Sequence, residues 1–221
     1  MRAFLAVALV VPSIAFASEA RGPNRVFQAA ASGVSPVSQA LDAAALANAG
    51  RGHADLLLAA ARTAAQANAT ANTRSKKTEG GKSSAPEKPL ALDPAALLEA
   101  AAAAAPAKSD LAKVVASTRA AGLPAGTRGK TYHQTERVAS GATDVFEISF
   151  KASEPAQVGV AGLGEGDIDL RVFDEQWNEI CASTSDSSRE YCSFVPATTG
   201  MFRIRVKNQG KATEDYVLVT N

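Results

Sequence analysis

Aromatic residues, histidine and cysteine are scarce in this sequence, and its charges almost cancel. Of its 221 residues 5% are aromatic, two are histidine and two are cysteine, and the formal net charge is +1. A chain without excess positive charge has no general attraction for polyanions, so we expect no nucleic-acid partner. Two histidines also leave few groups for histidine-based catalysis.

Long hydrophobic runs are absent except at the start of the chain, where one has the form of a secretory signal. Apolar residues dominate positions 3–16, after a single charged residue, and lead to a small-residue site at Ala17 and Ser18. A membrane span needs about 20 apolar residues, and this run is shorter and contains Pro12. We therefore predict a signal peptide over residues 1–17, cleaved between Ala17 and Ser18.

Export without a membrane anchor follows from the rest of the chain. No cysteine precedes Cys181, so a lipid-bearing cysteine directly after the cleavage site is excluded. No later stretch is long and apolar enough to cross a bilayer, so we expect no membrane span after signal removal. The predicted location is periplasmic or secreted.

Alanine and charge divide the chain near residue 130. Forty of the 48 alanines precede residue 130, and nine of the twelve aromatic residues follow it. The first part has 14 basic and 8 acidic residues, whereas the part from Lys130 has 9 and 14. These opposite charges would attract the two parts to each other. Salt screens such attraction over about 8 Å, which favours two separately solvated surfaces. We predict an alanine-rich helical region over 18–129 and a second domain over 130–221.

The first part contains four helical patterns. Two are rich in helix-forming residues and are separated by Gly50-Arg51-Gly52, at about 37–48 and 54–68. A third begins at Asp93-Pro94 and ends before Pro106, and a fourth runs from Ser109 to Gly122. Their apolar stripes are thin, so each helix is marginal alone.

A polar tract separates the second and third helices. Residues of about 70–90 include almost nothing that can be buried, which predicts a flexible linker. Lys76, Lys77 and Lys82 make the tract basic. They could touch an anionic surface, but cations in a mobile tract are more often solvated.

From Lys130 onward the hydrophobic period changes to two. Alternating residues such as Phe146, Ile148 and Phe150 predict strands with one buried face. Similar runs are centred on residues 131–138, 158–160, 168–172, 179–183, 190–195, 202–206 and 217–219. Seven or eight short strands in this span predict two packed antiparallel sheets, a jelly-roll-like β-sandwich in a mainly β protein.

Four segments of this part resemble the bacterial pre-peptidase C-terminal domain, over about residues 130–221. They are GATDVF at 141–146, GDIDLRVFD at 166–174, TGMFRIRV at 199–206 and YVLV at 216–219. The resemblance implies a jelly-roll-like, noncatalytic accessory of secreted enzymes, associated with calcium or with substrate adhesion. No peptidase sequence precedes the module here, which departs from the family pattern.

The two cysteines are Cys181 and Cys192, each in a predicted strand and separated by ten residues. In an exported chain this pattern predicts a cross-strand disulfide. A metal site is the weaker alternative, because no further thiols are present and His53 and His133 are distant in sequence.

No catalytic motif accompanies the histidines. His53 and His133 lie outside any nucleophile-elbow sequence, and no phosphate loop, dinucleotide fingerprint or His-Glu-x-x-His motif is present. We therefore predict no catalytic residues and no cofactor, and interpret both histidines as surface residues. An enzyme with an unrecognised site stays an alternative.

Two features could carry binding. Asp167 and Asp169 alternate onto one strand face, where Asp144, Glu165 or Asp174 could complete a set of calcium ligands. Aspartates at strand ends also commonly bond local backbone amides, which is the competing interpretation.

Trp177, expected in a turn, could stack on a sugar or contact a partner, or pack over its hairpin. The sequence therefore predicts an exported noncatalytic binding or accessory module, whose partner is a protein or glycan of the cell envelope. A calcium-dependent adhesion or carbohydrate-binding module is the alternative.

Overall fold

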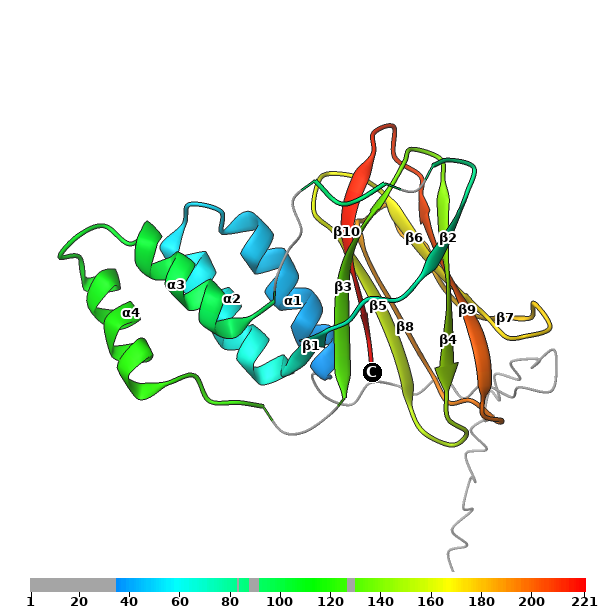
Figure 1. Ribbon diagram of the computed structural model, residues 1–221, viewed down its shortest axis with the longest axis horizontal. Helices are drawn as coiled ribbons and strands as arrows, with labels where there is room; N and C mark the ends of the chain where they lie inside the picture. Colours follow the sequence, from blue (N-terminus) through cyan, green and yellow to red (C-terminus); the bar gives the residue numbers. More distant parts are fainter. Residues whose placement is uncertain (1–34, 83, 88–91, 127–129) are drawn as a thin grey trace, which may run out of the picture.

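The computed structural model describes residues 35–82, 84–87, 92–126 and 130–221. Four helices lie on one side of a β-sandwich, with α1 next to the strands and α4 farthest from them (Figure 1). The predicted signal peptide over 1–17 and its cleavage site at Ala17 and Ser18 lie outside the described residues.

The helices begin and end where the capping signals predict. They are α1 (Pro36–Ala49), α2 (Ala54–Ala67), α3 (Pro94–Ala104) and α4 (Asp110–Ala121). The side chains of Ser35, Asp93 and Ser109 each accept a hydrogen bond from a backbone amide of the first turn, at 3.0–3.1 Å. These caps satisfy amides that a helix start leaves without partners.

Eight strands of the sandwich lie beyond residue 130, as the period-two pattern predicts. They are β3 (Thr131–Val138), β4 (Thr143–Phe150), β5 (Ala156–Gly162), β6 (Ile168–Phe173), β7 (Glu179–Ser183), β8 (Arg189–Phe194), β9 (Gly200–Asn208) and β10 (Glu214–Thr220). They form two sheets together with β1 (Ala69–Ala71) and β2 (Lys76–Glu79). Sheet A has the order β1-β3-β10-β5-β8, and sheet B has the order β2-β4-β9-β6-β7.

The core between the sheets is built from the alternate residues of both. Phe146, Leu170, Ile204 and Leu218 are fully buried there. The rings of Phe150, Phe194 and Phe202 meet at centroid distances of 5.2–5.8 Å. The predicted antiparallel β-sandwich is thus confirmed.

The helical region packs on the outer face of sheet A rather than standing apart from it. Leu41 of α1 is buried against Gly159 of β5. A Cβ atom added at Gly159 would lie 2.4 Å from the Cδ1 atom of Leu41. Val217 and Val219 of β10 belong to the same apolar cluster as the alanine-rich faces of α1 and α2. This contact is apolar, so the opposite net charges of the two parts do not explain it.

The predicted flexible linker over about 70–90 requires a correction. Residues 69–71 pair in parallel with β3 at the edge of sheet A, and residues 76–79 pair with β4 at the edge of sheet B. We call residues 69–79 the edge strap, because they pass from one sheet to the other along one open edge of the sandwich. Strand edges supply free backbone groups that a polar segment without a core of its own can pair with.

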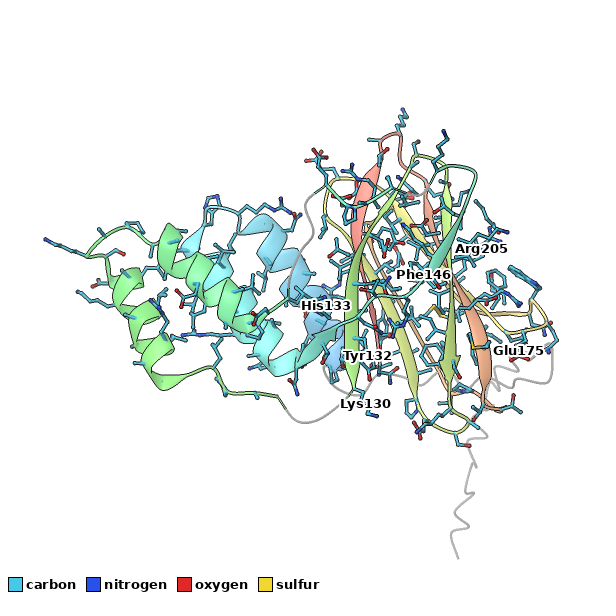
Figure 2. The ribbon with its side chains drawn as sticks, in the orientation of Figure 1. Lys130, Tyr132, His133, Phe146, Glu175 and Arg205 are labelled. Carbon is cyan, nitrogen blue, oxygen red and sulfur yellow. A yellow bond between two sulfur atoms is a disulfide. The ribbon has the colours of Figure 1, made fainter. Side chains whose placement is uncertain are left out.

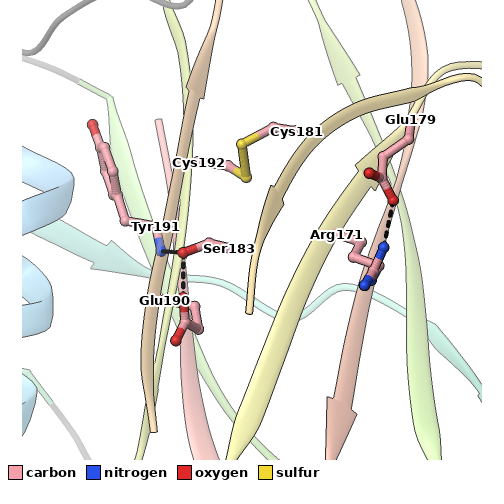
Figure 3. Close-up of a disulfide and its surroundings, with 7 residues drawn as sticks. All are labelled: Arg171, Glu179, Cys181, Ser183, Glu190, Tyr191 and Cys192. Carbon is pink, nitrogen blue, oxygen red and sulfur yellow. Dashed lines mark hydrogen bonds and ion pairs between the residues drawn. A yellow bond between two sulfur atoms is a disulfide. The ribbon is translucent and has the colours of Figure 1, made fainter. Parts of the chain in front are cut away.

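A disulfide closes the opposite edge. Cys181 lies in β7 of sheet B and Cys192 in β8 of sheet A, and their sulfur atoms are bonded (Figure 3). The predicted disulfide is therefore confirmed, and it joins the two sheets. Closing a loop with a sequence separation of 11 residues stabilises the fold by about 3 kcal/mol in the chain-entropy model.

Candidate functional site

Asp144, which could have completed a set of calcium ligands, instead binds the buried ammonium group of Lys76. Its carboxylate accepts hydrogen bonds from Lys76 Nζ at 2.7 Å, Thr78 Oγ1 at 2.6 Å and Tyr216 Oη at 2.8 Å. Burial, and secondarily the charge of Asp144, raises the pKa of Tyr216 well above its usual value, so the phenol keeps its proton. The Asp144 carboxylate therefore binds the edge strap to the sandwich through Lys76 and Thr78.

Asp174 closes the turn between β6 and β7. Its Oδ1 atom accepts from the amides of Gln176 and Asn178, both at 2.9 Å, and its Oδ2 atom accepts from the Asn178 side chain at 2.8 Å. This is the local backbone role that the sequence left open as the competing interpretation. Asp174 therefore fixes the turn that carries Trp177.

Asp167 and Asp169 lie near further acidic groups but do not form a metal cage. Asp169 accepts from Gln209 Nε2 at 2.7 Å. Desolvation raises the pKa of Asp167, and the negative charges of Asp169, Asp186 and Glu190 raise it further. Within residues 35–82, 84–87, 92–126 and 130–221, no group of three or more His, Cys, Asp or Glu residues could hold a metal ion.

The two histidines occupy unrelated positions. His53 is exposed at the start of α2, whereas His133 is 5% exposed in β3, on the helix side of the sandwich (Figure 2). The prediction that His133 is a surface residue was wrong, because its strand face is covered by the helical region. Its Nδ1 atom has no hydrogen-bond partner in the described part of the chain, whereas a catalytic triad needs a carboxylate at that atom.

Trp177 is held by a strained turn. Its φ angle is +64°, in the left-handed region that costs a non-glycine residue about 1–2 kcal/mol. Its amide donates to the Asp174 carbonyl at 3.1 Å, and the Asp174 amide donates to the Asn178 carbonyl at 3.0 Å. The pairing of β6 with β7 shifts register at Val172 and Phe173, directly before the turn. These hydrogen bonds hold the strained turn in one conformation. The direction of the Trp177 side chain is therefore fixed.

The indole of Trp177 lies over two arginines of β9. The guanidinium carbon of Arg203 is 4.6 Å from the ring centroid and that of Arg205 is 6.0 Å from it. The ring of Phe173 lies at 5.8 Å with a tilt of 54°. Trp177 is nevertheless 49% exposed. Arg203 thus packs against the ring while about half of the Trp177 side chain stays accessible to solvent.

Carboxylates and carbonyl oxygens hold these arginines in place. Arg203 donates to the carbonyls of Asp174 at 3.3 Å and Glu175 at 3.0 Å, and pairs with Glu147 at 3.4 Å. Arg205 pairs with Glu79 of the edge strap at 2.9 Å. Each arginine under the indole is thus already neutralised by a neighbouring strand.

The strand register places these groups on one surface. Val145 of β4 lies opposite Arg205 of β9 on one side and Lys77 of β2 on the other, and Glu147 lies opposite Arg203. We call this surface the Trp177 face, the outer face of sheet B. Its side chains are Lys77, Glu79, Val145, Glu147, Trp177, Met201, Arg203 and Arg205. Figure 2 shows Arg205 and Glu175 on the side of the sandwich away from the helices.

A groove of about 380 Å³ crosses the Trp177 face. Its lining includes Trp177, Arg203 of β9 and Lys77 and Glu79 of β2, with Val145 on β4 between those two strands. Met201 on β9 is 40% exposed on the same face. Of the three basic residues of the predicted linker, Lys76 and Lys77 both line this groove, but the Nζ atom of Lys76 bonds Asp144 inside the sandwich, and Lys82 is exposed.

Comparisons with known proteins add no family. No protein-family model matches the chain, and no curated protein matches it. The pre-peptidase C-terminal domain of a Bacillus anthracis collagenase is similar over 38% of this chain and 86% of its own, at 15% identity and a TM-score of 0.33. A periplasmic inhibitor of g-type lysozyme from Aeromonas hydrophila is similar over 41% and 84%, at 14% identity and a TM-score of 0.32. A carbohydrate-binding module of a Zobellia galactanivorans laminarinase is similar over 40% and 79%, at 13% identity and a TM-score of 0.26.

Proposed function

We propose that this protein is a noncatalytic binding module of the bacterial envelope or extracellular space, and that its ligand docks on the Trp177 face. The observation that carries the proposal is the half-exposed indole, fixed by a strained turn and backed by Arg203. Tryptophan, arginine and methionine are the residue types enriched at the centres of binding surfaces. All three are present on this face.

The arrangement of layers supports the choice of face. The helices cover the outer face of sheet A, the edge strap lies along one edge of the sandwich and the disulfide spans the other. Of the three exposed large hydrophobic residues in the described ranges, two, Trp177 and Met201, belong to the Trp177 face. The remaining one, Val114 on α4, is isolated.

The proposed location rests on the predicted signal peptide and on the disulfide. Disulfides persist in oxidising compartments such as the periplasm and the extracellular space. None of the helices in the described ranges has the length and hydrophobicity of a membrane span.

Co-sedimentation with envelope material tests the function. Mature protein is mixed with washed cell-envelope particles, and the fraction left in the supernatant is measured against particle concentration. We expect Trp177→Ala to weaken retention at least tenfold, because a central aromatic anchor typically accounts for about 2 kcal/mol or more of binding.

Val114→Ala is the matched control, since it also removes exposed apolar surface but lies on α4. It should bind as the unchanged protein does. Equal retention of Trp177→Ala and the unchanged protein would contradict the proposal.

A further inference from the structure

We infer that the ligand of the Trp177 face is an uncharged glycan chain, whose sugar rings stack on Trp177 and whose hydroxyls bond the flanking charged groups. The inference rests on the proposed function and names its ligand. Three observations support it: the near balance of charge along the groove, the exposure of the Trp177 ring and the pairing of the strand backbones beneath.

The charges around the groove nearly balance, since three cations face two carboxylates. Arg203 lies with Glu147 and Arg205 with Glu79, and Lys77 Nζ is 4.0 Å from Glu79. A polyanion would have to displace these carboxylates, and a polycation would meet the arginines. A surface whose arginines are paired and whose net charge is only 3 − 2 = +1 therefore favours a ligand without net charge.

The same pairs suit hydroxyl groups. Carboxylate oxygens accept hydrogen bonds from hydroxyls, and guanidinium and ammonium groups donate to hydroxyl oxygens, so both roles of a hydroxyl can be satisfied. The side chains of Glu147 and Glu79 are 60% and 37% exposed, so they can accept further hydrogen bonds. Hydroxyl-rich ligands match this set of donors and acceptors better than apolar ones do.

The exposed part of the Trp177 ring supplies the apolar part of the contact. The face of an aromatic ring is the negative end of its quadrupole, so it attracts the positively polarised C–H groups on one side of a sugar ring. Arg203 beneath the ring keeps it in one orientation, which lowers the entropy that binding would cost. Val145 continues the apolar surface along the floor of the groove.

A peptide strand fits this surface less well. Extended peptides bind mainly by adding a strand to a free sheet edge. The Trp177 face is the flat side of β2, β4, β9 and β6, whose backbones already pair with one another. The groove of about 380 Å³ is also at the lower end of the range of about 300–1,000 Å³ typical of small-molecule sites, which suits a few sugar units.

Fluorescence titration tests the inference, because Trp177 is the only tryptophan of the chain. Mature protein is titrated with neutral hexasaccharides of β-1,3-glucose, β-1,4-glucose, α-1,4-glucose, β-1,4-mannose and β-1,4-N-acetylglucosamine. An oligogalacturonide of equal length is the acidic counterpart. We expect at least one neutral chain to shift the emission of Trp177, with an affinity that changes less than twofold between 50 and 500 mM NaCl.

Calorimetry with variants completes the test. Trp177→Ala should lower the affinity for that neutral chain at least tenfold, Glu147→Gln should lower it severalfold, and Val114→Ala should leave it unchanged. No binding by any neutral chain at millimolar concentration, or tighter and salt-sensitive binding of the oligogalacturonide, would overturn the inference. If envelope retention still depends on Trp177 in that case, the binding function stands and only the ligand class is wrong.

Discussion

His133 illustrates how one buried side chain ties stability to pH. It is 5% exposed in β3, and desolvation lowers the pKa of its imidazole below the usual 6.5. Between the usual value and the lower folded value, the unfolded chain binds more protons than the folded one. The free energy of unfolding therefore decreases as the pH falls through this window.

We expect His133→Gln to flatten that dependence. Urea denaturation between pH 7.5 and 5 should give a smaller decrease in unfolding free energy for the variant than for the unchanged protein. His53→Gln, at the exposed start of α2, is the matched control and should keep the full decrease. Glu214 and Asp167, whose pKa values burial raises, titrate in all three proteins and cancel in the comparison. Identical pH slopes for His133→Gln and the unchanged protein would show that another group titrates.

Trp177 marks where prediction from residues alone reached its limit. The sequence places it in a turn, and the alternation in β9 places Arg203 and Arg205 on one strand face. Whether the indole contacts a partner or packs over its hairpin stayed open. In the structure the ring packs on Arg203, and Trp177 is still 49% exposed. That outcome depends on β9 lying beside β6, a pairing between segments about 30 residues apart that local patterns do not encode.

At the scale of elements, the edge strap is the segment for which amino-acid composition predicts the wrong structure. Its residues are polar and have little to bury, which is typical of a flexible linker. They are ordered because they bind residues that lie far along the chain, which local composition does not reveal. Lys76 meets Glu136 at 3.0 Å and Asp144 at 2.7 Å, and Arg74 bonds Thr220. The helices and the other strands were predictable because capping residues and hydrophobic periods are local signals.

The Lys76 contact gives the element-scale prediction. Replacing Lys76 by Met leaves two carboxylates without their cation in a site where the lysine side chain is only 6% exposed. Removing one partner of a buried ion pair typically costs about 3–5 kcal/mol. Urea denaturation should show that loss for Lys76→Met.

Lys77→Met is the control for this experiment. Lys77 is the next residue on the same strand, but its side chain is 80% exposed and 4.0 Å from its partner carboxylate. Exposed pairs contribute about 0–1 kcal/mol, so this variant should be nearly as stable as the unchanged protein. Similar losses in both variants would mean that the strap is held by its backbone pairing rather than by Lys76.

At the scale of the whole molecule, the helices dock on the sandwich through apolar surface rather than charge. One ion pair between them is Arg189–Asp42 at 2.6 Å, whose side chains are 42% and 40% exposed, so it contributes little. The sequence showed two parts of opposite charge and left their docking open. Alanine-rich helices approach a sheet closely where a glycine removes a side chain, and that match is visible only when α1 lies on β5.

The contact between Gly159 and Leu41 therefore tests whether the parts behave as one unit. A methyl group at residue 159 would lie 2.4 Å from Leu41 Cδ1 in a buried site, so Gly159→Ala should cost about 1–3 kcal/mol. Leu41→Ala alone should cost about 2–5 kcal/mol by leaving a cavity. In the Leu41→Ala background the added methyl group has room, so Gly159→Ala should cost less there than in the unchanged protein.

Urea denaturation of the four proteins gives the coupling energy, and two probes give the cooperativity. Circular dichroism at 222 nm follows the helices, and the fluorescence of Trp177 follows sheet B, on the far side of the sandwich. If α1 and sheet A share one core, the transitions in the unchanged protein coincide, and the double variant loses less unfolding free energy than the sum of the two single losses. Additive substitutions or separate transitions would mean that the helical region folds independently, and that the Trp177 face would keep its binding without it.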